Sequence, residues 1–235
     1  MIYNAYHLLG KYLKSKLAIA GSDNRGLTFI ELIVVLSIVG AISSTVLFQF
    51  GSFSSNVTLQ NLAQDIALII KKAQTNAISG SLSSGFIAGQ APSYGVNFDT
   101  TSGNQNKFNY FRDIGTVGIT PDGILNGNCN NPGASGNECL GVTTIQSSDT
   151  IVSLCDGGGK CTYKNLSVTF SRPFPDPTFR TKTAGVAVPL TTGGAQIVIQ
   201  SAKGLKKTII IWPIGQISVV DGDAKNLFPN GGSTL

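Results

Sequence analysis

The sequence predicts an α+β protein in which one long N-terminal helix packs on an antiparallel β-sheet. Between Phe29 and Phe50 the only charged residue is Glu31, and this run is long enough to cross a bilayer as a helix, which needs about 20 apolar residues. Apolar residues then recur at helical spacing up to residue 79. Beyond residue 80, short apolar segments separated by Gly- and Asn-rich stretches are typical of strands joined by hairpins.

Residues 1–26 form a basic segment ahead of the apolar run. They carry four cations against one acid, and they are too short and too broken to span a membrane. The first cations after the run are Lys71 and Lys72, so the charge asymmetry places the N-terminus in the cytoplasm and the following domain outside. The chain has a formal net charge of +5, but without residues 1–26 it holds 13 basic and 11 acidic residues, a net +2. Overall charge therefore gives little support to a nucleic-acid partner.

The apolar run has two simpler interpretations. One is an ordinary secretory signal, although such signals have apolar regions of about 7–15 residues and a small-residue cleavage site. The other is an unprocessed single-span anchor. Glu31 argues against both, because a charge inside a membrane segment is costly and is usually kept for function.

The predicted helix continues from residue 51 to residue 79. Residues 51–56 (Gly-Ser-Phe-Ser-Ser-Asn) are its weak point, and Gly80 is a plausible stop signal. No proline lies between residues 27 and 79, so the usual cause of a sharp kink is absent. The residues expected to pack on the sheet share one helical face: Leu62, Ile66, Ile69, Ile70, Ala73 and Ala77.

The segment from residue 80 to residue 235 is expected to form a β-rich domain. Residues 120–141 are expected to form a long loop, and residues 172–177 an extended proline-rich loop. Pro213 should end its strand or mark a sheet edge. The expected strands are 94–98, 108–111, 149–154, 166–171, 185–190, 195–201, 208–212 and 215–220.

The heptapeptide Gly26-Leu27-Thr28-Phe29-Ile30-Glu31-Leu32 resembles the processing site of type IV prepilins and pseudopilins. The resemblance implies a pilin-like fold and cleavage by a prepilin peptidase between Gly26 and Leu27, with methylation of the new amine. Residues 1–26 would then be a cytoplasmic leader that is removed. Residues 27–50 would form the transmembrane and filament-core half of the helix, and residues 51–79 its amphipathic half. The sequence departs from the family in having Leu27 where Phe is usual, a long leader, and Phe48 where many pilins carry a proline.

The resemblance also implies an assembly mechanism. Pilin-like subunits make head-to-tail contacts that generate open helical filaments. Glu31 would then be buried in a medium of low dielectric, where a carboxylate needs a partner. The partner implied by the family is the N-terminal amine of a neighbouring subunit, here Leu27, which exists only after cleavage.

A looser resemblance links residues 62–79, the strand at Tyr94–Asp99 and the segment Gly215–Val219 to H-type minor pseudopilins of type II secretion and related minor pilins. It implies a structural subunit, a minor one, of a type IV pilus or a type II secretion pseudopilus, anchored in the cytoplasmic membrane with its C-terminal domain outside. The implied partners are prepilin peptidase, other pilin or pseudopilin subunits, an inner-membrane assembly platform and, before assembly, the lipid bilayer.

Four cysteines, Cys129, Cys139, Cys155 and Cys161, lie on the expected outer side, where disulfides persist. The spacings favour two local pairs, with Cys155 and Cys161 flanking a hairpin loop, but four cysteines allow three pairings. A zinc site is the alternative, although the gaps are longer than zinc ligand pairs usually have.

Three further features have weaker interpretations. Lys203, Lys206 and Lys207 are expected in a turn between two paired strands, where they would contact phosphates if the outer domain bound DNA or a surface. Asp221-Gly222-Asp223 is a turn that lacks further ligands at calcium-loop spacing. Gly157–Lys160 superficially matches a phosphate-binding loop but is followed by cysteine instead of Ser or Thr. We expect no enzymatic activity, no metal and no cofactor.

Overall fold

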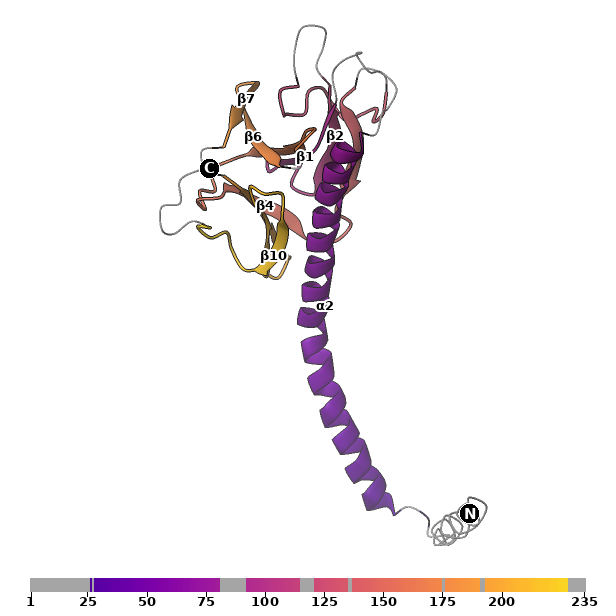
Figure 1. The fold of residues 1–235 in the computed structure, drawn as a ribbon. Coiled ribbons are helices and arrows are strands. Elements are labelled where there is room, and N and C mark those ends of the chain that lie inside the picture. Colours follow the sequence, from indigo (N-terminus) through magenta and orange to yellow (C-terminus); the bar gives the residue numbers. More distant parts are fainter. Residues whose placement is uncertain are drawn as a thin grey trace, which may run out of the picture. The chain divides into compact units, whose positions relative to one another are not determined.

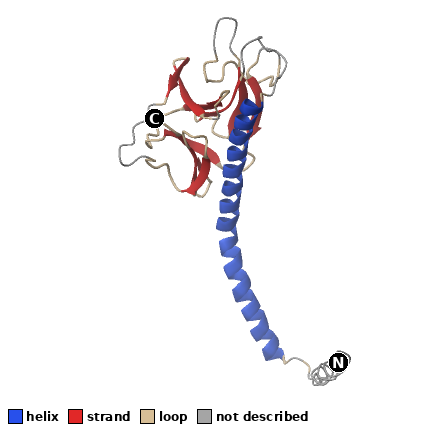
Figure 2. Cartoon of the chain, in the orientation of Figure 1, coloured by secondary structure: helices blue, strands red, loops and turns tan. Residues whose placement is uncertain are grey.

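The computed structural model describes residues 26, 28–80, 92–114, 121–134, 137–174, 176–190 and 193–227. The chain divides into two compact units after Gln49, and each is treated by itself. Figure 1 and Figure 2 show one long helix followed by antiparallel strands, which confirms the predicted α+β class and the long N-terminal helix.

Helix α2 runs without interruption from Phe29 to Ser79. The predicted weak point at residues 51–56 is helical, and the Ser55 hydroxyl donates to the Gly51 carbonyl at 3.0 Å. The helix ends at Gly80, whose φ of +64° suits the left-handed turn that follows many helices. The Arg172 guanidinium donates from Nε and Nη2 to the Ile78 carbonyl, which satisfies one of the free carbonyls at the helix end.

The strands form two antiparallel sheets. The six-stranded sheet has the order β3-β2-β1-β5-β6-β7, and the four-stranded sheet has the order β10-β9-β8-β4. The strand bounds are β1 Ser93–Asp99, β2 Lys107–Asp113, β3 Cys139–Thr144, β4 Thr150–Asp156, β5 Asn165–Phe170, β6 Pro177–Thr183, β7 Val186–Pro189, β8 Ala195–Gln200, β9 Lys206–Ile211 and β10 Ile217–Asp221.

One hydrophobic core joins the second half of α2 to both sheets. Ile66 and Ile70 are fully buried in it, together with Val96 of β1 and Ile197 of β8. Polar contacts support the same packing, because the Asn76 side chain donates to the Tyr110 hydroxyl at 2.6 Å. The predicted apolar stripe of the helix thus packs on the sheets.

An irregular segment covers part of the outer face of each sheet. Ile124 is 1% exposed, in a loop that lies against Arg180 of the six-stranded sheet. On the four-stranded sheet, the buried Gln196 side chain bonds the backbone N–H and carbonyl of Lys225. Strands β1 and β5 are therefore buried on both faces, and they do not show the alternation expected of a half-exposed sheet.

The structure differs from the predictions for the β-domain in four places. Strand β3 begins inside the segment predicted to be a loop up to residue 141, and strand β6 was not predicted at all. Lys206 and Lys207 lie in β9, not in the turn before it. Cys155 and Cys161 do not flank a hairpin of paired strands, because β4 and β5 belong to different sheets and only the isolated bridge Leu154–Tyr163 links the segments there.

Candidate functional site

The first turn of α2 carries the predicted processing and assembly residues. Gly26 is exposed, whereas Leu27, the expected new N-terminus, lies outside the described residues, as does the leader up to residue 25. The Thr28 hydroxyl accepts a hydrogen bond from the Glu31 N–H at 3.3 Å. Thr28 is thus the N-cap, and Thr28-Phe29-Ile30-Glu31 has the spacing of a capping box. Sequence reasoning missed this second role for the segment, although Thr-x-x-Glu is its signal.

Glu31 occupies an electrostatically favourable place in the helix. It is the acidic residue of the first turn, where a carboxylate interacts well with the positive end of the helix dipole. Its side chain is exposed in the isolated chain. The carboxylate is therefore open to a partner outside this chain.

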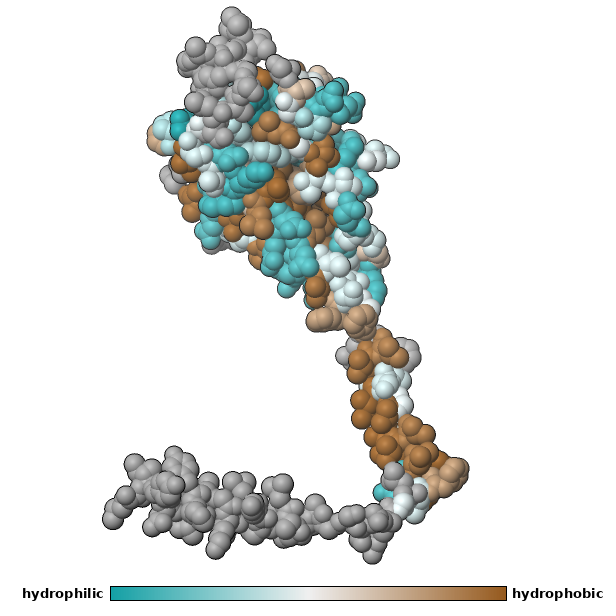
Figure 3. All heavy atoms as spheres, turned by 90° about the vertical axis from the view of Figure 1, so that its right-hand side faces the viewer, coloured by the Kyte–Doolittle hydropathy of each residue, from teal (hydrophilic) through white to brown (hydrophobic). Residues whose placement is uncertain are grey.

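Apolar side chains cover α2 on all sides from Phe29 to Leu47. Every side chain in this stretch is exposed, as the brown surface in Figure 3 illustrates. The most apolar part of this stretch buries none of its residues within the chain. Within the described residues, α2 is the one helix long and apolar enough to cross a membrane, so the structure is compatible with a single-pass anchor near the N-terminus.

All four cysteines form disulfides between the locally paired positions. Cys129 bonds Cys139, and Cys155 bonds Cys161, with Cα atoms 5.4 and 4.0 Å apart. The loop between Cys155 and Cys161 is a tight turn in which the Asp156 carboxylate accepts the Lys160 N–H at 3.0 Å. This turn accounts for the glycines that superficially match a phosphate-binding loop.

The three candidate phosphate-binding lysines differ in their contacts. Lys206 forms a salt bridge with Asp223 at 2.9 Å, and Lys207 forms one with Asp221 at 2.5 Å. The two aspartates of the Asp-Gly-Asp turn thus neutralise two of the three cations. Lys203 differs, because its ammonium group lies against α2 at Gly51, where an added Cβ would be 2.6 Å from Nζ.

Two carboxylates fasten the covering loop to the six-stranded sheet. Asp113 Oδ2 accepts the Gly123 N–H at 2.6 Å, and Glu138 Oε2 accepts the Asn126 N–H at 2.5 Å. Burial raises the pKa of Asp113 to about 6, and the nearby Asp122 carboxylate adds to that effect. Burial likewise raises the pKa of Glu138 to about 7, with repulsion from the other two acids contributing. Because these oxygens bond backbone N–H groups, their evident role is to hold the loop.

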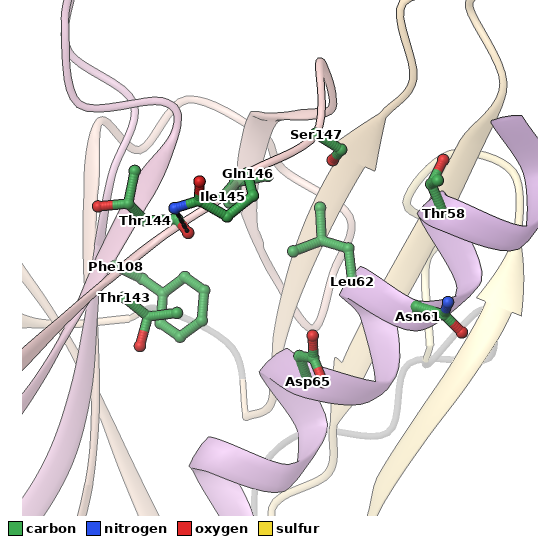
Figure 4. Close-up of a pocket in the computed structure, with 10 residues that line it drawn as sticks. All are labelled: Thr58, Asn61, Leu62, Asp65, Phe108, Thr143, Thr144, Ile145, Gln146 and Ser147. Carbon is green, nitrogen blue, oxygen red and sulfur yellow. Dashed lines mark hydrogen bonds between the residues drawn. The ribbon is translucent and has the colours of Figure 1, made fainter.

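An open groove lies between α2 and the end of β3. Leu62 and Phe108 contribute apolar surface to it, and hydroxyl and amide side chains surround them (Figure 4). Of the residues that line it, Asp65 alone has an acidic or basic side chain. The groove lining thus offers a mixed polar and apolar contact surface and a single carboxylate.

No model of a known protein family matches the chain, and neither a curated protein nor a solved structure matches it. The functional argument therefore rests on the sequence and on the structural features described above.

Proposed function

We propose that this chain is a structural subunit of a pilin-like filament, either a type IV pilus or a type II secretion pseudopilus, in which it is a minor component. The observation that carries the proposal is the contrast along α2. One half packs into its own domain, whereas the half that begins with Glu31 exposes apolar surface on every side. A lipid bilayer covers such a surface before assembly, and neighbouring helices cover it in a filament.

The first turn supplies the chemistry of the assembly step. Prepilin peptidase cuts after Gly26 and leaves the amine of Leu27 two residues before the start of the helix at Phe29. In a filament core, the exposed Glu31 carboxylate of one subunit pairs with the Leu27 amine of the next. Each charge removes the cost of burying the other, which is why a lone carboxylate is tolerated in this apolar run.

A minor pilin whose outer domain binds DNA is the second function considered, and the structure offers it less support. Two of the three lysines that would contact phosphate are paired with aspartates. The charge that remains on this surface is therefore small, whereas non-specific DNA affinity rises with the number of phosphates neutralised.

Replacement of Glu31 separates the assembly role from the capping role. We expect Glu31→Gln to abolish incorporation into filaments, because the neighbouring amine then has no counter-charge. Glu31→Val should have the same effect and should leave membrane insertion intact or improved, since it removes a charge from the bilayer. The measurement is the amount of each variant in sheared filament fractions and in membranes of cells that carry the assembly machinery.

The matched control is Thr28→Ala, which removes the N-cap and keeps the carboxylate. This variant should be processed and should enter filaments, because capping contributes only about 1 kcal/mol to the helix end. If Glu31→Gln assembled normally, the role of Glu31 would be capping, which Gln also serves, and the pairing mechanism would be wrong.

A further inference from the structure

The turn between β8 and β9 lies beside the point at which the apolar run of α2 ends. The run ends at Phe50, and the next residue, Gly51, is the one against which the Lys203 ammonium lies. Both residues belong to the same compact unit. A Cβ at Gly51 would be 2.6 Å from Nζ, so in this structure the ammonium group occupies space that a side chain at Gly51 would fill.

The turn is well fixed, so the position of Lys203 is a property of the fold. Ser201 and Leu205 close it through a backbone hydrogen bond of 2.8 Å, and the Ser201 hydroxyl accepts the Leu205 N–H at 3.1 Å. Gly204 has a φ of +82°, a conformation that favours glycine. Lys203 is exposed at the tip of this turn, and no salt bridge to it occurs among the described residues, in contrast to Lys206 and Lys207.

Exposed apolar side chains lie close to Gly51 and to Lys203 in the sequence. Phe50 and Phe53 of α2 are each 66% exposed, and Leu205 of the turn is 41% exposed. The helix has no acidic residue between Glu31 and Asp65. Exposed Phe and Leu side chains insert at the boundary between headgroups and acyl chains, and a lysine extends its ammonium group to the phosphates there.

We propose that the β8–β9 turn is a lipid-contact site, in which Lys203 binds the phosphate groups of anionic phospholipids at the outer face of the membrane while Phe53 and Leu205 contact the interface. If residues 29–50 span the bilayer, they cover about 33 Å at 1.5 Å per residue, close to the hydrocarbon thickness of about 30 Å. Gly51 and Lys203 then fall at the level of the outer headgroups. The site would hold the globular unit against the membrane before assembly. This inference rests on the membrane-anchored state that the proposed function requires.

Lysine footprinting on the full chain tests the site without any substitution. The protein is placed in phosphatidylcholine vesicles with or without phosphatidylglycerol and in neutral detergent micelles, and a water-soluble acetylating reagent is added. Mass spectrometry then gives the acetylation rate of each lysine. Lys203 should react about fivefold more slowly in vesicles with phosphatidylglycerol than in micelles. The exposed Lys182 on β6 is the internal control, and its rate should not change.

Two further experiments identify what protects Lys203 from acetylation. Inorganic phosphate added to the micelles should leave Lys203 reactive, because a free anion lacks the alignment that the anchored helix provides. Leu205→Glu should restore the reactivity of Lys203 in the anionic vesicles, whereas Lys182→Glu should not.

The outcomes that would overturn the inference are distinct from failure of the anchor. One such outcome is protein that floats with the anionic vesicles at high salt while Lys203 reacts as fast as it does in micelles. That result would refute the lipid contact and leave the anchor intact. Equal protection in neutral micelles would show that the protein itself shields the lysine, which also refutes it. Protein that does not float with the vesicles would refute both the lipid contact and the anchor.

Discussion

The two halves of α2 are continuous in structure and differ in what covers their apolar residues. From Leu59 to Ala77, one face of the helix is buried in the core, and the exposed residues of the opposite face are mostly polar. From Phe29 to Leu47, every side chain is exposed, although most are apolar. The fold thus buries apolar side chains of the second half only. Under the proposed function, stability of the globular unit and assembly are therefore encoded in separate segments of one helix.

Removal of a core side chain should give the largest effect and the clearest contrast. Ile66→Ala empties a fully buried position, so it should lower the free energy of unfolding by about 2–5 kcal/mol. Leu68→Ala, two residues away at a position 66% exposed, and Leu36→Ala in the first half should each change it by less than about 0.5 kcal/mol. Urea unfolding of the full chain in neutral detergent, followed by the fluorescence of the single tryptophan, measures all three. Equal losses of unfolding free energy for Ile66→Ala and Leu36→Ala would contradict the difference between the two halves of the helix.

Each disulfide should stabilise the globular unit by a smaller amount. The bonds join residues that are 10 and 6 positions apart, and closing loops of that size restricts the unfolded chain by about 2–3 kcal/mol. Replacement of Cys129 and Cys139 together by Ala, or of Cys155 and Cys161 together, should lower the urea midpoint accordingly. The same loss is expected in micelles and in vesicles, because the bonds lie outside the apolar half. A midpoint unchanged by both pairs of substitutions would show that neither bond restricts the unfolded chain.

The pH dependence of stability should come from the loop that Asp113 and Glu138 hold. Their pKa values in the folded chain, about 6 and about 7, are raised above the usual 3.8 and 4.5, so the folded state binds more protons than the unfolded state between about pH 4 and pH 7. Stability from these groups is therefore greatest at the acid end and is lost as pH rises through 6 to 7. We expect a change on the order of 2 kcal/mol in all, since the two shifts are coupled.

Isosteric amides test this assignment of the pH dependence. Asp113→Asn and Glu138→Gln keep an oxygen that accepts the Gly123 or Asn126 N–H and remove the charge. The double variant should unfold with little pH dependence between pH 5 and pH 8 and should match or exceed the wild type at the alkaline end. An undiminished pH dependence in the double variant would place the titrating groups elsewhere.

The smallest effect should be local to the start of α2. Thr28→Ala removes the hydroxyl that accepts the Glu31 N–H, which should weaken the first turn by about 1 kcal/mol. Because this turn lies outside the globular unit, the urea midpoint should not move. Amide hydrogen exchange in micelles should instead become faster at Glu31 and stay unchanged at Ile66. A shift of the global midpoint would show that the two halves are not independent.

The sequence was most informative where a periodic pattern was long. The apolar run and the helical spacing beyond it predicted α2 closely, and short cysteine spacings indicated the disulfide pairs that the structure contains. Strand β6 was missed because Pro177 and the prolines before it favoured a loop, although proline is tolerated at the first position of a strand. The alternation of buried Phe179 and Thr181 with exposed Thr178 and Lys182 was the signal that could have identified it.

Contacts between distant segments were beyond the reach of sequence reasoning. The Asp113 carboxylate bonds an N–H ten residues away, and the Lys203 ammonium lies against Gly51, far earlier in the chain. Neither contact follows a fixed spacing, so no local sequence pattern predicts it. Lys206 and Lys207 were placed in a turn because they lie between two segments predicted to be paired strands, but their ammonium groups pair with Asp223 and Asp221.

The chemical identity of the mature N-terminus tests the proposed function most directly. Protein isolated from cells that contain a prepilin peptidase is analysed by intact mass and by sequencing of its N-terminal peptide. The account predicts a chain that begins with N-methylated Leu27, because only cleavage after Gly26 creates the amine that Glu31 is proposed to pair with. A mature chain that begins near Met1, or one that begins after Phe50, would contradict it.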